Sequence, residues 1–66
     1  MTAVKVKDNN GVVGYVATEH WADPDIFMMD FQVAENGVST DGDKVFAGDT
    51  FPKYREDLEY CGIEEF

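Results

Sequence analysis

The stretch between Asp8 and Asp43 contains no lysine or arginine, although it spans 36 residues and carries eight acidic side chains. The five basic residues all lie outside it: Lys5, Lys7, Lys44, Lys53 and Arg55. The formal net charge is -9 on 66 residues. Such an excess of one sign repels itself and destabilises a compact state. A function that uses the charge, most simply contact with a positively charged partner, is therefore favoured.

Cysteine and long apolar segments are also scarce. Cys61 is the single cysteine, so no internal disulfide can form and a disulfide-held extracellular scaffold is excluded. No apolar run approaches the ~20 residues that a membrane-spanning helix needs, and residues 1–5 lack the hydrophobic stretch of a secretory signal. Anionic lipids and nucleic-acid phosphates would repel so acidic a chain. We therefore expect a cytoplasmic protein that contacts neither membranes nor nucleic acid directly.

Groups that could carry catalysis are few. A nucleophilic mechanism needs a nucleophile, a base within reach and a group that orients the base. The one histidine, His20, lies in a predicted loop, and Cys61 lies on a predicted apolar helix face. A thiol in that position behaves as a small hydrophobic group. We therefore expect neither an enzyme nor a cofactor.

Clustered aspartates raise the question of calcium. An EF-hand loop that began at Asp41 would have Asp43 at its third position, but Val45 at the fifth and Pro52 at the twelfth. Those two positions need oxygen ligands, so the motif is absent and we expect no dedicated metal site. An irregular cation site formed by Asp41, Asp43 and Asp49 stays open as an alternative to ordinary turn chemistry.

Size and composition predict one small α+β domain over residues 1–66, with an antiparallel sheet of three to five strands and one C-terminal helix packed on one face. Asn10-Gly11 is typical of a two-residue type I′ hairpin turn, because both central residues of that turn need a positive φ. The turn would pair Val6 with Tyr15. The sheet is therefore expected to begin with a hairpin.

The segments that follow are predicted from alternation and turn residues. Residues 19–25 are predicted to be a loop, and the alternating run Ile26–Val33 is predicted to be a strand. Asn36-Gly37 and Asp41-Gly42 are both typical of turns, so either a very short strand or a bulge lies between them. Lys44–Ala47 would form the last strand. The face that packs on the helix would consist of Val4, Val6, Val13, Tyr15, Phe27, Met29 and Phe31.

The C-terminal segment has a helical period. Apolar residues recur there at spacings of three and four: Phe51, Tyr54, Leu58 and Cys61. With Pro52 in the first turn and Gly62 just past the end, this pattern predicts a helix over Phe51–Cys61. Its charges oppose its dipole, because Lys53 and Arg55 lie near the positive end.

A partner-binding surface is predicted in the acidic middle of the chain and at its acidic end. Asp23 and Asp25, if extended, place two carboxylates on one side about 6.6 Å apart, and Trp21 precedes them. An outward tryptophan and methionine ringed by carboxylates are typical of a binding hot spot with a charged rim. The predicted contact residues are Glu19, Trp21, Asp23, Asp25, Met28, Asp30 and Glu59. Alternatively, Trp21 folds back over the sheet edge and the acids only solvate the surface.

Two functions fit these features. The first is a small acidic module that inhibits another protein by occupying a basic groove. In size and charge the chain resembles the DNA-mimic inhibitors of phages and mobile elements, which are short, strongly acidic and poor in cysteine. The resemblance implies a viral protein of the host cytoplasm, whose carboxylates pair with basic residues of a nucleic-acid-binding groove. The alternative is an accessory subunit that homo-oligomerises through Ile26 and Met28 or joins a larger assembly, with acidity serving solubility.

Overall fold

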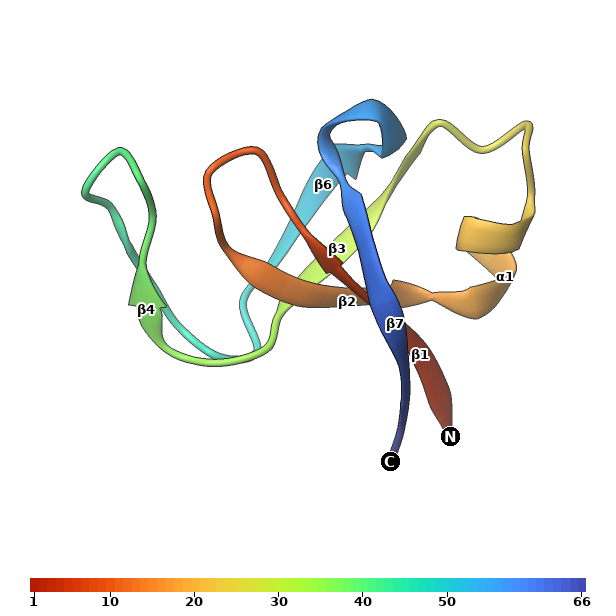
Figure 1. Cartoon of the computed structure of the whole chain (residues 1–66), viewed down its shortest axis with the longest axis horizontal. Coiled ribbons are helices and arrows are strands. Elements are labelled where there is room, and N and C mark those ends of the chain that lie inside the picture. Colours follow the sequence, from red (N-terminus) through yellow and green to blue (C-terminus); the bar gives the residue numbers. More distant parts are fainter.

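Seven β-strands form half of the chain in the computed structural model, which describes residues 1–66 (Figure 1). They are β1 (Thr2–Lys7), β2 (Val13–Ala17), β3 (Met28–Val33), β4 (Gly37–Val38), β5 (Lys44–Val45), β6 (Thr50–Tyr54) and β7 (Glu59–Glu65). The helical parts are the short helix α1 (Thr18–Ala22) and the 3₁₀ turn η1 (Arg55–Asp57). Five strands form one antiparallel sheet in the order β6-β3-β2-β1-β7, and β4 pairs with β5 separately.

The main sheet is curled. A flat sheet of five strands would hold its two edge strands about 19 Å apart, because neighbouring strands lie about 4.8 Å apart. The chain passes from β6 to β7 through η1 and Leu58 alone, a connection of only about 13 Å. The edges therefore approach each other where η1 joins them, at the top of Figure 1. Curling lets one sheet enclose its own core.

The core lies on the concave side of this sheet. Its buried residues are Val4, Val6, Val12, Val16, Met29, Phe31, Val33 and Leu58. Three half-buried side chains from outside the main sheet pack against it: Trp21, Ile26 and Val45. In a chain this short the core needs these additions, because a small domain buries a low fraction of its surface.

The predicted C-terminal helix is wrong, and with it the predicted α+β class. Residues 50–65 instead form β6 and β7, which pair with β3 and β1. Of the four residues that suggested a helix face, only Leu58 is buried, while Phe51, Tyr54 and Cys61 are exposed. Two short strands separated by a 3₁₀ turn happened to space these residues at helical intervals. The protein is predominantly β.

Pro52 occupies a strand, although it was predicted to begin a helix. The Arg55 N–H donates to the Phe27 carbonyl and the Val33 N–H to the Asp49 carbonyl, so the odd-numbered residues of β6 face β3 through hydrogen bonds. Pro52 lies between them, and its backbone nitrogen faces the free edge, where no donor is needed. This is the position that a sheet allows for proline.

Gly62 marks a β-bulge rather than a helix end. The register of β1 with β7 shifts between Lys5, which pairs with Gly62, and Val6, which pairs with Tyr60. Cys61 is the extra residue, and Gly62 has a φ of +134°. A bulge commonly places such a glycine in an otherwise regular strand.

The first hairpin is present, but its turn differs from the predicted type. The Gly11 N–H donates to the Asp8 carbonyl at 3.1 Å, and the Asp8 N–H donates to the Val12 carbonyl at 2.9 Å. Gly11 has a φ of +80°, whereas Asn10 does not have a positive φ. These features define a three-residue loop, a type I turn followed by a left-handed glycine. The predicted type I′ turn is therefore wrong.

The longer loop shifts the register by one residue and reverses the faces of β2. Val6 pairs with Gly14 and not with Tyr15. Val16 is consequently buried, while Val13 and Tyr15 are only half-buried and belong to the outward face. The predicted inward positions of Val13 and Tyr15 are therefore wrong.

The remaining predictions are partly confirmed. Residues 28–33 are a strand with Met29 and Phe31 buried, as predicted, but Phe27 is 69% exposed. The predicted loop over residues 19–25 begins instead with α1. Gly37–Val38 is the very short strand, and Gly42, with a φ of +86°, lies in a turn of the same type as that at Gly11. None of the helical segments is long or apolar enough to cross a membrane.

Candidate functional site

Arg55 holds the connection between α1 and β3 against the end of β6. Its Nε donates to the Ile26 carbonyl at 2.9 Å and its Nη1 to the Trp21 carbonyl at 2.8 Å. Its Nη2 donates to the carbonyls of His20 and Asp23, each at 2.8 Å. Two of these acceptors belong to the last turn of α1, which lacks partners within the helix. The rigid fork of the guanidinium makes such a set of contacts possible.

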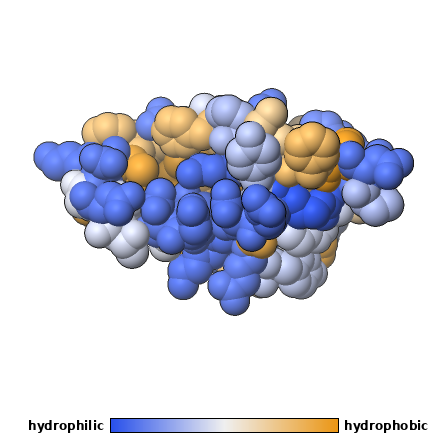
Figure 2. Space-filling view, turned by 90° about the horizontal axis from the view of Figure 1, so that it is seen from above, coloured by the Kyte–Doolittle hydropathy of each residue, from blue (hydrophilic) through white to orange (hydrophobic).

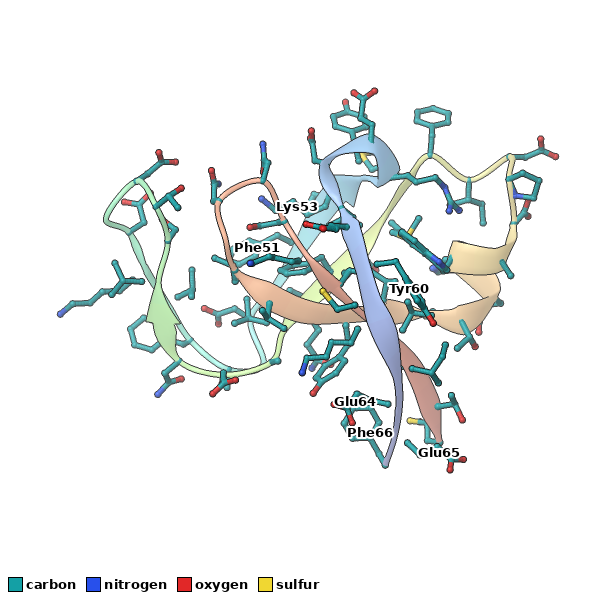
Figure 3. The ribbon with its side chains drawn as sticks, viewed as in Figure 1. Phe51, Lys53, Tyr60, Glu64, Glu65 and Phe66 are labelled. Atoms are coloured by element: carbon teal, nitrogen blue, oxygen red, sulfur yellow. The ribbon has the colours of Figure 1, made fainter.

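The Trp21 side chain lies against the Arg55 guanidinium and is half-buried. The Arg55 guanidinium lies 4.9 Å from the centroid of its ring, and the Tyr60 ring stacks on it with centroids 6.2 Å apart. Tyr60 lies on β7 beside α1 in Figure 3. Of the two alternatives for Trp21, the structure shows the one in which the ring folds back onto the protein.

Asp8 is a buried carboxylate whose oxygens all have partners. Its Oδ1 accepts the N–H groups of Asn10 at 2.9 Å and Val12 at 2.8 Å. Its Oδ2 lies 3.3 Å from Nζ of Lys53, which extends from β6 (Figure 3). Asp8 is 7% exposed, so this pair fastens the β1–β2 loop to the opposite edge of the curled sheet. The buried charge is therefore compensated within the protein by Lys53 and two backbone N–H groups.

The remaining carboxylates have almost no partners within the molecule. Fourteen acidic residues are present, and two of them form ion pairs: Asp8 with Lys53, and Glu64 with Lys5 at 3.7 Å. Twelve are left unpaired. Three of the five basic residues are occupied, because Lys5 and Lys53 form those pairs and Arg55 binds backbone carbonyls. The charges that lack an opposite partner are therefore predominantly negative.

Six of the unpaired carboxylates lie along one long side of the molecule. The β1–β2 loop, the β4–β5 loop, η1 and the α1–β3 connection all lie on the upper side in Figure 1, and we call them together the loop end (residues 9–12, 39–43, 55–57 and 23–27). Its carboxylates are Asp23, Asp25, Asp41, Asp43, Glu56 and Asp57. Figure 2 views this end and shows a mostly hydrophilic surface with hydrophobic groups along one margin. The only cation of the loop end is Arg55, which is already occupied.

Comparison with family models, curated proteins and solved structures finds no match to this chain.

The predicted contact residues lie on α1, the α1–β3 connection, β3 and β7. Asp23 and Asp25 belong to the loop end, and the Asp23 Oδ1 accepts the Asp25 N–H at 2.9 Å. Glu19 and Asp30 border a shallow groove of about 490 Å³ on the outward face of β2 and β3. The other three predicted residues are Met28, 49% exposed at the start of β3, Glu59, exposed at the start of β7, and Trp21, described above.

Two exposed aromatic residues were missed as site residues. Phe27 and Tyr54, with Arg55 and Glu56, line a hollow of about 430 Å³, which we call the Phe27–Tyr54 hollow. Phe27 was predicted to face inward because it alternates with Met29, and Tyr54 was assigned to a helix that is absent. The sequence offered no signal for either, since both errors follow from the pairing of β6 with β3.

Two further candidate sites, a cleft and a possible cation site, offer fewer groups that could bind a ligand. A cleft of about 290 Å³ separates the β4–β5 hairpin from the sheet and has an apolar floor at Phe31 and Val33, with Lys44 and Lys53 at its sides. No three acidic, histidine or cysteine side chains come close enough to hold a metal ion. Asp41, Asp43 and Asp49 are therefore not gathered into a cation site.

Proposed function

We propose that this protein is a small acidic binding module whose loop end occupies a basic groove of another protein, in the manner of a nucleic-acid mimic. The observation that carries the proposal is the charge distribution. Twelve of the fourteen carboxylates have no cationic partner in the molecule, and three of the five basic side chains are engaged internally. A surface of this kind attracts a basic partner and speeds association at low salt.

The shape of the loop end supports the same partner. Its acidic connections are spread along the longest dimension of the molecule, which is 32 Å. One turn of duplex DNA is about 34 Å long. A groove that holds one turn of duplex could therefore contact the β4–β5 loop, η1 and the α1–β3 connection together. The single cysteine suits a reducing compartment, so the proposal places the protein in the cytoplasm.

Homo-oligomerisation has less support. The free edge of β6 contains Pro52, which offers no N–H, and the free edge of β7 has a bulge and three glutamates. Both features oppose strand addition between copies. Ile26, which was predicted to contribute to a dimer contact, packs against the core. Two copies at -9 each would also repel.

The proposal is tested by affinity capture from host lysate at about 50 and about 200 mM salt, the range over which phosphate-like contacts weaken steeply. We expect basic nucleic-acid-handling proteins to be enriched at the lower concentration and lost at the higher one. The binding variant combines Asp25→Asn, Glu56→Gln and Asp57→Asn. The control removes the same charge elsewhere with Glu35→Gln, Asp49→Asn and Glu65→Gln.

Only the first variant should lose the captured proteins, and duplex DNA should displace them from the unmodified protein. Equal behaviour of the two variants would remove the loop end from the proposal. Capture that persists unchanged at high salt would contradict an electrostatic mimic and favour a hydrophobic assembly.

A further inference from the structure

The α1–β3 connection exposes an aromatic side chain that a small protein would be expected to bury. Phe27 is 69% exposed, although Met29 and Phe31, which follow it in alternation, are in the core. Its backbone is firmly held, because its carbonyl accepts the Arg55 N–H at 2.7 Å and the preceding carbonyl, of Ile26, accepts Arg55 Nε. The exposed ring therefore sits on a fixed backbone, a preorganised state that lowers the ordering cost of binding.

A second exposed ring lines the same hollow. Tyr54 is 50% exposed and shares the Phe27–Tyr54 hollow, whose volume is about 430 Å³. The aromatic rings that contact one another in this protein are Tyr15 with Phe66 and Trp21 with Tyr60. Neither ring of the hollow is among them, so neither is stacked on another ring of the protein.

The two connections around the hollow carry more negative than positive charge. Glu56 lines it, is exposed and has no ion pair. Arg55 also lines it and keeps its positive charge, but its N–H groups are directed to the carbonyls of the α1–β3 connection, and Asp23, Asp25 and Asp57 of the same connections outnumber it. The faces of aromatic rings carry negative potential and attract cations. The hollow thus combines two exposed rings with an unpaired carboxylate.

We infer that the Phe27–Tyr54 hollow receives an arginine side chain of the basic partner. A guanidinium is planar, weakly hydrated and always charged, so it stacks on a ring while its N–H groups bond a carboxylate in pairs. Phe27 or Tyr54 provides the ring and Glu56 the carboxylate. Lysine carries the same charge but lacks the plane and the paired donors. The inference rests on the proposed function, because it names the anchor of the same interaction, and arginine is enriched in such anchors.

The test compares fluorescently labelled hexa-arginine and hexalysine peptides, whose charges are equal, by anisotropy at about 150 mM salt. The general acidity attracts both peptides, and the hollow should add a preference for arginine of about fivefold. Phe27→Leu keeps an apolar side chain but removes the ring, and Glu56→Gln removes the carboxylate. Each variant should abolish most of the preference while leaving hexalysine affinity within about twofold.

Phe46→Leu is the matched control, because Phe46 is 55% exposed and lies outside the hollow. It should keep the full preference. Equal affinity of the unmodified protein for both peptides would overturn the arginine site and leave the proposed function standing. If neither peptide bound, both the arginine site and the proposed function would be overturned. A preference that survives Phe27→Leu, with amide NMR shifts away from Phe27, Tyr54 and Glu56, would also overturn the assignment.

Discussion

Single residues with several simultaneous partners determine how the connections of this protein are held. Asp8 accepts two backbone N–H groups and pairs with Lys53, and Arg55 donates to four carbonyls. In both cases one charged side chain satisfies backbone groups that no strand or helix partner reaches. Backbone groups without such partners would each cost free energy where water is excluded.

We predict that Arg55→Lys lowers the free energy of unfolding by about 2 kcal/mol or more, because an ammonium group cannot reach four carbonyls that a planar fork reaches together. Urea denaturation followed by tryptophan fluorescence measures the change, since Trp21 lies beside the substituted group. Lys44→Met is the control, because Lys44 is exposed and forms no ion pair, and it should alter stability by less than about 0.5 kcal/mol. Equal midpoints for Arg55→Lys and the unmodified protein would show that the carbonyl contacts contribute little.

At the scale of elements, the close approach of β2 to β3 depends on one glycine. A Cβ atom at Gly14 would lie 2.4 Å from the Gln32 carbonyl oxygen and 2.6 Å from Cζ of Phe31. Gly14 has no positive φ, so the requirement is for space. We predict that Gly14→Ala costs about 1–3 kcal/mol, because the Phe31 ring must leave its position in the core.

The matched substitution is Gly37→Ala, for which a Cβ atom would meet nothing within 4 Å. It should change thermal stability by less than about 0.5 kcal/mol. Differential scanning calorimetry of both variants gives the comparison. Similar melting temperatures for the two would indicate that β2 and β3 can separate without loss.

At the scale of the whole molecule, the unpaired charge opposes folding. Twelve unpaired carboxylates lie on a molecule 32 × 25 × 17 Å in size, so many of them lie within a Debye length of about 30 Å at 0.01 M salt. We predict that raising the salt from about 0.01 to about 0.15 M stabilises the protein, by on the order of 1 kcal/mol. The sign is positive because screening weakens repulsion more than it weakens the single exposed ion pair of Lys5 with Glu64.

Urea midpoints at the two ionic strengths test this, with the triple variant Glu35→Gln, Asp49→Asn and Glu65→Gln as the comparison. That variant should gain stability at low salt and respond less to added salt. A midpoint that falls with salt would mean that ion pairs outweigh the repulsion.

The apolar spacing that predicted a C-terminal helix conflicted with the placement of the charged residues in the same segment. Lys53 and Arg55 would have stood at the positive end of the helix dipole, an arrangement that local helix physics disfavours. In the structure no such helix exists and both cations have partners, Asp8 and the carbonyls of residues 20–26. The disagreement between apolar spacing and charge placement was the feature of the sequence that argued against a helix.

The sequence by itself determined the net charge, the absence of a disulfide, the presence of the first hairpin and the strand over residues 28–33, because composition and local alternation depend on neighbours in the chain. Tertiary structure alone decided the register of that hairpin, the conversion of residues 50–65 into β6 and β7, and the positions of Phe27 and Tyr54. Those features depend on pairing between segments far apart in sequence, β6 with β3 and β7 with β1. The placement of six carboxylates along one long side of the molecule was decided in the same way, since the curled sheet brings four separate connections together there.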